Sequence, residues 1–320
     1  MKHLRRVGRA ARIFAIGYGL FIALFLVLRL LVGERFWLVA LFDALLPALF
    51  FPALALLLIG LITRHMRVMV AQFPALLGFM LLYSTVLLPP PTTAQPGDIR
   101  FGLLTYNVYS RNDSYSEIAR IIREADAEIV LLQEVSATAA VYFEQNLADL
   151  YPQRVFYPHE GHAGQGALSR YPIVTQTYWQ MELGHLRLEV QINDTPVVIY
   201  SLHPIHPFLL TRGLFNQTPQ NAEIDDALAR AAAESGAVVL AGDFNISDLS
   251  DAYERITASY GDAFRAEGGG LGLTFPAFFP LARLDYVFYN SAIVPVDARV
   301  WPEAAGSDHF PLLVHLSLAP

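Results

Sequence analysis

Cysteine is absent from this chain of 320 residues, and charged side chains are scarce. Without cysteine the protein has no disulfide bonds and no thiolate, which leaves oxygen and imidazole ligands for any metal site. Charged residues form 16% of the chain, against about 25% in an average globular protein, and hydrophobic residues form 54%. The hydrophobic excess is concentrated before residue 90, as a membrane-embedded segment requires.

The charge is divided unevenly between the two parts of the chain. Residues 1–96 carry nine basic and two acidic side chains, a net charge of +7. Residues 97–320 carry thirteen arginines, no lysine and 27 acidic side chains, a net charge of −14. Nucleases for long polymers normally present a basic surface, so this balance predicts that long nucleic acid is not a partner.

Long apolar runs before residue 90 predict three transmembrane helices, at 13–32, 36–62 and 68–88. A span needs roughly 20 apolar residues, and no small-residue cleavage site follows the first run. Five basic residues precede that run, which predicts a cytoplasmic N-terminus. Three crossings would make the protein a multi-pass protein of the cell membrane, with an extracytoplasmic C-terminal part.

The predicted organisation is a membrane domain over 1–88, a proline-rich linker over 89–98 and a catalytic domain over 99–320. A polyproline linker extends ~3.1 Å per residue, so this one would reach only about 25–30 Å. The membrane lipid bilayer is therefore a predicted partner of the outer domain, and no protein partner is predicted.

Short apolar runs after residue 97 alternate with helical patterns, which predicts an α/β fold. The predicted strands lie near 99–107, 128–133, 165–170, 187–192, 196–202, 237–242, 284–289 and 311–318. Polar residues stand at the ends of several strands, where α/β folds place their chemistry. These residues are Asn107, Glu134, His203, Asp243, Asn245, Asp285, Asp308 and His309.

Several carboxylates in one pocket repel each other, and a divalent cation relieves that repulsion. Oxygen ligands favour Mg²⁺ or Mn²⁺ as the cofactor. The pairs His159-x-x-His162 and His203-x-x-His206 offer zinc ligands as the alternative, although no fourth ligand is evident.

The order of these residues resembles that of the endonuclease/exonuclease/phosphatase (DNase I-like) superfamily. One motif alone is weak evidence, but seven in family order are specific. They are Thr105-Tyr106-Asn107-Val108, Leu132-Gln133-Glu134-Val135, Leu168-Ser169-Arg170-Tyr171-Pro172-Ile173, Ser201-Leu202-His203, Gly242-Asp243-Phe244-Asn245, Arg283-Leu284-Asp285-Tyr286 and Ser307-Asp308-His309-Phe310-Pro311. The resemblance implies a two-sheet, four-layer α/β sandwich and a hydrolase of phosphoric ester or anhydride bonds.

The same resemblance implies a metal-binding group, Glu134, Asn107 and Asp308. It also implies a catalytic group, His203, Asp243, Asn245, Asp285 and His309. Asp243 would orient or deprotonate the attacking water, and Asn245 would donate to a phosphoryl oxygen. His309, held by Asp285, would act as acid or base. His203 would stabilise the transition state or protonate the leaving group.

The arrangement of the chain, with His203-Pro204-x-x-Pro207 and Ser250-x-Ala252-Tyr253, resembles VanJ-type bacterial membrane phosphatases. That resemblance implies a membrane-proximal phosphate ester or anhydride as substrate, in particular undecaprenyl pyrophosphate. The predicted substrate contacts are Arg170, Phe208, Phe275, Phe278 and Phe279. The alternatives are a sphingomyelinase-like phosphodiesterase, an extracytoplasmic nuclease and an inactive lipid-binding membrane module.

Overall fold

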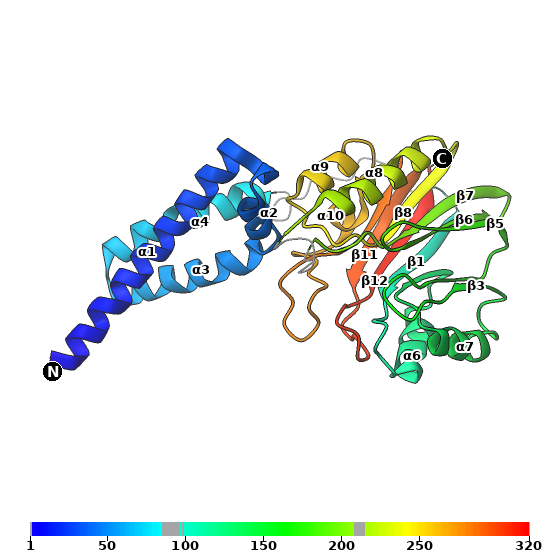
Figure 1. Ribbon diagram of the computed structural model, residues 1–320, viewed down its shortest axis with the longest axis horizontal. Coiled ribbons are helices and arrows are strands. Elements are labelled where there is room, and N and C mark those ends of the chain that lie inside the picture. The colour runs from blue at the N-terminus through cyan, green and yellow to red at the C-terminus, as the bar shows by residue number, and fades with distance from the viewer. Residues whose placement is uncertain (1, 85–96, 98, 208–214, 320) are drawn as a thin grey trace. The chain divides into compact units, whose positions relative to one another are not determined.

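The computed structural model describes residues 2–84, 97, 99–207 and 215–319. Its contacts divide the chain into two compact units, Met1–Pro89 and Pro90–Pro320, coloured blue to cyan and turquoise to red in Figure 1. Most of the predicted linker, at 89–96 and 98, lies outside the described residues.

The N-terminal unit consists of apolar helices. Helix α4 packs against both α1 and α3, and the rings of Phe50 and Phe79 meet edge to face at 5.4 Å between α3 and α4. The elements are α1 (Lys2–Val32), the 3-10 turn η1 (Gly33–Arg35), α2 (Trp37–Ala44), α3 (Leu46–Ile62) and α4 (Met66–Leu82).

These helices do not support the prediction of three transmembrane spans. Within the described residues, one helix, Gly8–Arg35, is long and apolar enough to cross a membrane. The second predicted run, 36–62, is broken between α2 and α3. These two helices are bent by 69° relative to each other, and they are long enough to cross a membrane only if the pair is counted as one span. Pro47 stands in the first turn of α3, where proline begins a new helix more readily than it continues an old one. Helix α4, at 17 residues, is shorter than the roughly 20 that a span needs.

The outward faces of the N-terminal helices are nevertheless apolar. Among the described residues, 29 large hydrophobic side chains are exposed, and 24 of them lie between residues 13 and 81. A helix bundle in water presents polar side chains outward. This surface is therefore suited to lipid rather than to water.

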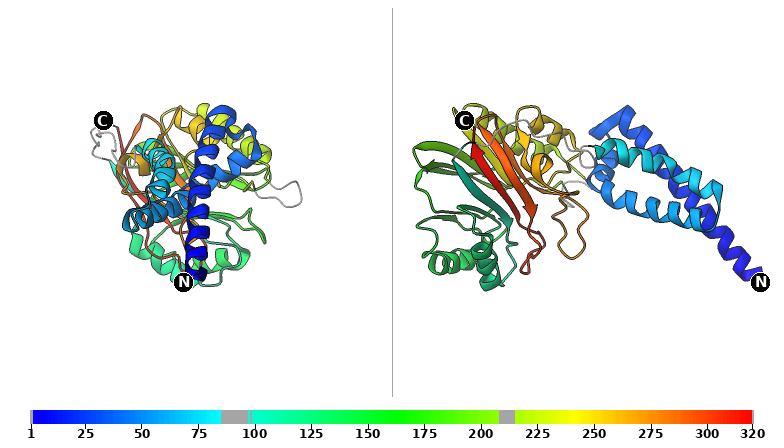
Figure 2. Two further views of the ribbon diagram at one scale, coloured as in Figure 1. Left: turned by 90° about the vertical axis from the view of Figure 1, so that its left-hand side faces the viewer. Right: turned by 180° about the vertical axis from the view of Figure 1, so that it is seen from behind.

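The C-terminal unit contains two six-stranded sheets, in the orders β11-β12-β1-β2-β4-β3 and β5-β6-β7-β8-β10-β9. Figure 2 shows β12 in red beside β11 in orange. The first sheet contains β1 (Arg100–Asn107), β2 (Ile129–Gln133), β3 (Gln153–Tyr157), β4 (Gln165–Ser169), β11 (Ile293–Val300) and β12 (Leu312–Leu318). The second contains β5 (Ile173–Gln180), β6 (Gly184–Ile192), β7 (Thr195–Leu202), β8 (Ala237–Asp243), β9 (Gly261–Asp262) and β10 (Asp285–Tyr289).

Helices cover the outer faces of both sheets, so the unit has four layers (Figure 1). Helices α6 (Tyr115–Ala125) and α7 (Ala137–Asn146) pack on the first sheet. Helices α8 (Thr218–Ala232) and α9 (Asp251–Thr257) pack on the second, and the short α10 (Ala263–Glu267) precedes β10. A separate buried cluster, which includes Leu131, Leu188 and Val239, fills the space between the sheets. The predicted two-sheet α/β sandwich is confirmed.

The strand order brings the polar strand ends to one edge of the sheets. Strands β1 and β2 are parallel, as are β7 and β8. Strand β12 runs antiparallel beside β1, and β10 runs antiparallel beside β8. In the first sheet, the carboxyl ends of β1 and β2 therefore lie at the same end as the amino end of β12. In the second sheet, the carboxyl ends of β7 and β8 lie at the same end as the amino end of β10.

Candidate active site

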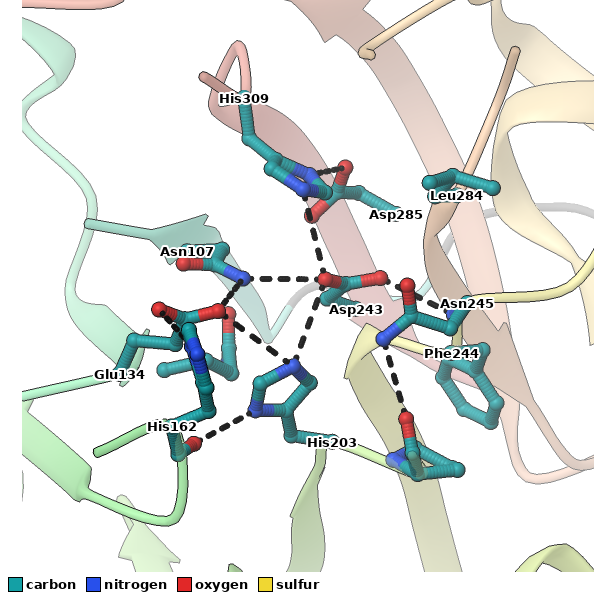
Figure 3. Close-up of polar contacts among 12 residues, drawn as sticks. Asn107, Glu134, His162, His203, Asp243, Phe244, Asn245, Leu284, Asp285 and His309 are labelled. Carbon is teal, nitrogen blue, oxygen red and sulfur yellow. Dashed lines mark hydrogen bonds and ion pairs between the residues drawn. The ribbon is translucent and has the colours of Figure 1, made fainter. Parts of the chain in front are cut away.

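Six predicted residues meet at this edge, linked by contacts of 3.9 Å or less (Figure 3). They come from both sheets: Asn107 ends β1, Glu134 follows β2, His203 follows β7, Asp243 ends β8, Asp285 begins β10 and His309 precedes β12. The strand register accounts for part of this convergence, because Asp285 lies directly opposite Asp243 in the β10–β8 pair.

Glu134 is a buried carboxylate on a left-handed turn residue with φ of 60°, an uncommon conformation for a residue with a side chain. One oxygen accepts the backbone N–H of Ser110 at 3.0 Å and lies 2.7 Å from His162 Nδ1. The other accepts from the Asn107 amide at 3.2 Å. Burial alone raises the pKa of Glu134, but the contacts with His162, His203 and Ser110 lower it to about 2. Glu134 is therefore ionised at neutral pH.

Asp243 lies at the centre of the cluster and is only 1% exposed. Its Oδ2 accepts from Asn107 at 3.0 Å and faces Nε2 of His203 at 3.6 Å and of His309 at 3.5 Å. Its Oδ1 accepts the backbone N–H of Asn245 at 3.0 Å. Burial raises the pKa of Asp243, although His309 opposes the shift. A raised pKa makes a carboxylate a better proton acceptor, as a general base requires.

His309 lies between two carboxylates. Its Nδ1 is 2.8 Å from Asp285 Oδ2, and its Nε2 faces Asp243. Burial lowers the pKa of His309, but Asp285 and Asp243 outweigh burial and raise it to about 10. The ring is therefore an imidazolium at neutral pH, ready to donate from Nε2. The backbone N–H of His309 donates to Ser307 Oγ at 3.1 Å, which fixes the loop.

His203 presents its second ring nitrogen to the site. Its Nδ1 lies 3.0 Å from the backbone carbonyl of His162, and because a carbonyl only accepts, Nδ1 carries the hydrogen. Its Nε2 lies 3.6 Å from Asp243 and 3.9 Å from Glu134. This orientation directs Nε2 toward the carboxylates at the centre of the site.

Asn245 and Asp308 adjoin the six central residues. The Asn245 side-chain amide donates to the Pro204 carbonyl at 3.0 Å, which ties the end of β8 to the segment after β7. Burial raises the pKa of Asp308, His309 lowers it and Glu134 raises it again. The half-buried Asp308 carboxylate thus lies within electrostatic reach of the site.

The predicted substrate residue Arg170 is not brought to the site. It follows β4, which runs antiparallel to β2, so Arg170 lies at the opposite end of the sheet from Glu134. There its guanidinium pairs with Asp126 and stacks over the Tyr151 ring at 5.5 Å. The direction of β4 therefore places Arg170 at the end of the sheet away from Glu134, where it cannot contact a substrate bound at this site.

The predicted phenylalanines fall into three different places. Phe208 lies outside the described residues. The ring of Phe275 packs against His309, with 4.8 Å between ring centroids. Phe278 and Phe279 are 89% and 62% exposed. Two side chains this exposed do not line an enclosed groove for a substrate tail.

The donor set of the site fits a divalent cation. Glu134, Asp243 and Asp308 are acidic, and no arginine or lysine of the described residues forms an ion pair with them. The buried Oδ1 of Asp285 has no hydrogen-bond partner in the described part of the chain. Oxygen donors of this kind suit Mg²⁺ or Mn²⁺.

One compact group of ligand atoms, within 4.8 Å of one another, comes from Asp243, Asp285 and His309. His309 lies between the two carboxylates with a raised pKa, so its ring must lose a proton before it can serve as a metal ligand, and the two carboxylates leave the group with a net negative charge. Glu134 with Asn107 and Asp308 remains the predicted ligand set, and within it the Asn107 amide contacts Glu134 at 3.2 Å. Within the described residues no compact metal-binding group contains His159 or His206, so the zinc alternative gains no support.

Sequence reasoning missed the contact of His162 with Glu134 and a buried polar network under the site. Gln133 donates to Ser201 Oγ at 3.0 Å, and that hydroxyl donates to Gln165 at 2.7 Å. The network joins β2 and β4 of one sheet to β7 of the other. In the sequence, the only sign of this network was the presence of hydroxyl and amide side chains beside the motifs.

A second missed pair lies behind His203. Glu223 on α8 accepts the backbone N–H groups of Leu183 at 2.8 Å and Ile205 at 2.6 Å, and lies 3.3 Å from His185 Nε2. His185 Nδ1 in turn accepts the backbone N–H of His203 at 3.3 Å. This buried pair holds the backbone on both sides of the His203 side chain.

The two-sheet sandwich and its strand-edge cluster define a phosphoester hydrolase. Residues 104–309 match the Endonuclease/Exonuclease/phosphatase family, and the chain belongs to that family. Members of the family are phosphoester hydrolases, such as phosphatases and nucleases, and generally use divalent metals.

The relatives of this chain differ widely in sequence. The protein YbhP of Escherichia coli (strain K12) is 27% identical over 258 residues, which cover 70% of this chain and 99% of YbhP. A mannosyl-6-phosphatase of Bacteroides thetaiotaomicron has a TM-score of 0.56 at 18% identity and covers 68% of this chain and 99% of its own. D. rerio TDP2, complexed with a single-strand DNA product, has a TM-score of 0.58 at 14% identity and covers 69% and 100%. The likeness to these two structures shows the fold alone.

Proposed function

We propose that this protein is a membrane-anchored, divalent-metal-dependent phosphohydrolase of a membrane-proximal phosphate ester or anhydride, with a lipid pyrophosphate of the undecaprenyl type as substrate. One chain combines a phosphohydrolase site, in which the Glu134 carboxylate is ionised, with a set of helices whose outward faces are apolar. This combination is the observation that carries the proposal. Neither feature alone selects a lipid phosphate.

The residues divide the chemistry among themselves. Mg²⁺ or Mn²⁺, held by Glu134 with Asn107 and Asp308, would supply positive charge for the phosphoryl oxygens. Asp243, with its raised pKa, takes the proton of the attacking water. His309, an imidazolium, donates from Nε2 to the phosphoryl group, and Asp285 holds the ring.

The substrate class follows from charge and location. The net charge of −14 on residues 97–320 repels a long polyanion. A soluble sugar phosphate would gain nothing from an apolar N-terminal unit. A phosphate group on a lipid satisfies both constraints, because the bilayer brings it to the enzyme.

A hydrolysis screen of the purified full chain, with Mg²⁺ and with EDTA, tests this proposal; it measures inorganic phosphate for the pyrophosphate and the phosphatidic acid, phosphocholine for sphingomyelin and strand cleavage for DNA. The panel is a prenyl pyrophosphate, sphingomyelin, phosphatidic acid and plasmid DNA. We expect the prenyl pyrophosphate to be hydrolysed fastest, and only with the metal. Faster cleavage of sphingomyelin or of DNA would establish the phosphodiesterase or the nuclease instead. No activity on any substrate would favour the inactive lipid-binding module.

For localisation we propose the cell membrane, with residues 1–88 as the membrane domain, 89–98 as the linker and 99–320 as the catalytic domain. Helix Gly8–Arg35 supports an anchor of at least one span. The five basic residues before the apolar run of α1 favour a cytoplasmic N-terminus and, for a single crossing, an extracytoplasmic active site.

A further inference from the structure

The loop at 274–282 stands beside the site and is unusual in composition. Residues 268–282 contain no charged side chain, in a unit whose net charge is −14. The loop connects the region after α10 to β10, and is drawn in orange in Figure 1, where it projects from the sheets.

The base of the loop is fixed to catalytic elements. The backbone N–H of Ala277 donates to the Asp308 carbonyl at 2.8 Å, and that of Phe310 donates to the Thr274 carbonyl at 2.9 Å. Phe275 packs on the His309 ring. Any surface that the tip of this loop contacts is therefore held next to the active site.

The tip presents two aromatic side chains to the surroundings. Phe278 is 89% exposed and Phe279 is 62% exposed. Among the described residues of the C-terminal unit, the other exposed large hydrophobic side chains are Val141, Val174 and Met181, none of them aromatic. An adjacent pair of exposed phenylalanines marks an interaction surface rather than a fold requirement.

Most backbone N–H groups of the loop are hydrogen-bonded within the protein. Within 274–282, six N–H groups donate to backbone carbonyls: those of Thr274, Phe275, Ala277, Phe279, Leu281 and Ala282. Pro276 and Pro280 have no N–H to satisfy. An uncharged loop with most of its N–H groups already hydrogen-bonded enters the interfacial region of a bilayer at a lower cost than a charged loop with free N–H groups.

We infer that the Phe278–Phe279 tip inserts into the bilayer surface and holds the active site at the lipid interface. The bilayer is the favoured occupant because the same chain carries an apolar-faced helical unit, on which most of its exposed hydrophobic side chains lie. The inference rests on the proposed membrane location and deepens it, because it makes the loop an interfacial anchor rather than the wall of a substrate groove.

The absence of cysteine allows a direct test. Phe279→Cys in the full chain is labelled with an environment-sensitive fluorophore and reconstituted into phosphatidylcholine vesicles that contain nitroxide-labelled lipid. Val141→Cys, on α7 and 59% exposed, is the matched control. We expect blue-shifted emission and strong nitroxide quenching at position 279 and neither at 141. Adding Phe278→Asp to Phe279→Cys should remove the shift, because a charge opposes insertion.

Equal quenching at positions 279 and 141, whether strong or weak, would overturn the inference. So would insertion that persists undiminished in Phe278→Asp. The readout requires no catalysis, so a protein that inserts its tip but hydrolyses no phosphate would refute the proposed reaction and leave the interfacial anchor standing.

Discussion

At the scale of single residues, the predicted site residues divide into those that lie in the cluster and take part in the proposed reaction, and those that lie elsewhere. Glu134→Gln, Asp243→Asn and His309→Ala should each lower turnover by at least about 100-fold, the usual loss for a metal ligand or an acid–base group. Steady-state phosphate release measures the effect. Arg170→Gln is the control with near-normal turnover, because Arg170 lies at the opposite sheet edge. Near-normal activity of Asp243→Asn in EDTA would contradict a metal-assisted water mechanism.

The pairing of His309 with Asp285 predicts a pH dependence. The pKa of His309 is raised from 6.5 to about 10, with burial opposing and Asp285 and Asp243 causing the rise. A raised folded-state pKa stabilises the fold fully below pH 6.5, and that stabilisation is lost as the pH rises through about 10.

Asp285→Asn removes one of the two carboxylates and should move the alkaline limb of the pH–rate profile to lower pH. Asp297→Asn is the matched control, because Asp297 faces the more exposed His315 at 3.5 Å, away from the catalytic cluster. An unmoved alkaline limb in Asp285→Asn would show that His309 is not the group that titrates.

At the scale of elements, helix α8 supports the site through one buried side chain. Glu223→Ala should lower the free energy of unfolding by about 1–3 kcal/mol for each backbone N–H left without an acceptor. It should also reduce kcat more than it raises KM, because His203 loses its backbone support through His185. Thermal unfolding and steady-state kinetics measure the two effects. Asp225→Ala, at an exposed position of α8, should change neither, and equal effects of both variants would assign Glu223 no special role.

The elements also show which sequence signals are strong. The eight predicted strands are the eight inner strands of the two sheets, and the unpredicted β3, β5, β9 and β11 are the four edge strands. An inner strand is buried on both faces and appears as an apolar run. An edge strand is not buried on both faces and shows no continuous apolar run. Strand β5, for example, is exposed at five of its eight positions. The predictable part of the sheets is therefore the part that carries the site.

At the scale of the whole molecule, the N-terminal unit should retain the protein in the membrane. The full chain should sediment with membranes and resist a high-salt wash, because apolar rather than ionic contact holds it. A reporter fused after Pro320 should behave as extracytoplasmic. A reporter active only in the cytoplasm would contradict the proposed orientation and place the active site on the other side of the membrane.

The sequence by itself determined the inner strands, the polar residues that end them and the family to which they belong. These features are local, because burial on both faces selects apolar residues along a strand and the chemistry selects the residue at its end. The sequence also showed the apolar composition of the N-terminal part. It did not show the number of spans, because hydropathy alone does not show a helix break such as the bend between α2 and α3, where Pro47 stands in the first turn of α3.

Only the tertiary structure decided which of these residues meet. Arg170 and Glu134 stand in similar motifs, yet the antiparallel direction of β4 sends Arg170 to the far edge. His162 stands only in a His-x-x-His pair that predicted zinc, and Glu223 stands in no motif, yet both support side chains of the site through contacts between distant segments. Phe275 and Phe278 share one apolar loop, but the first packs on His309 while the second is exposed. Strand direction, register and exposure arise from pairing across the whole domain, so no local pattern in the sequence encodes them.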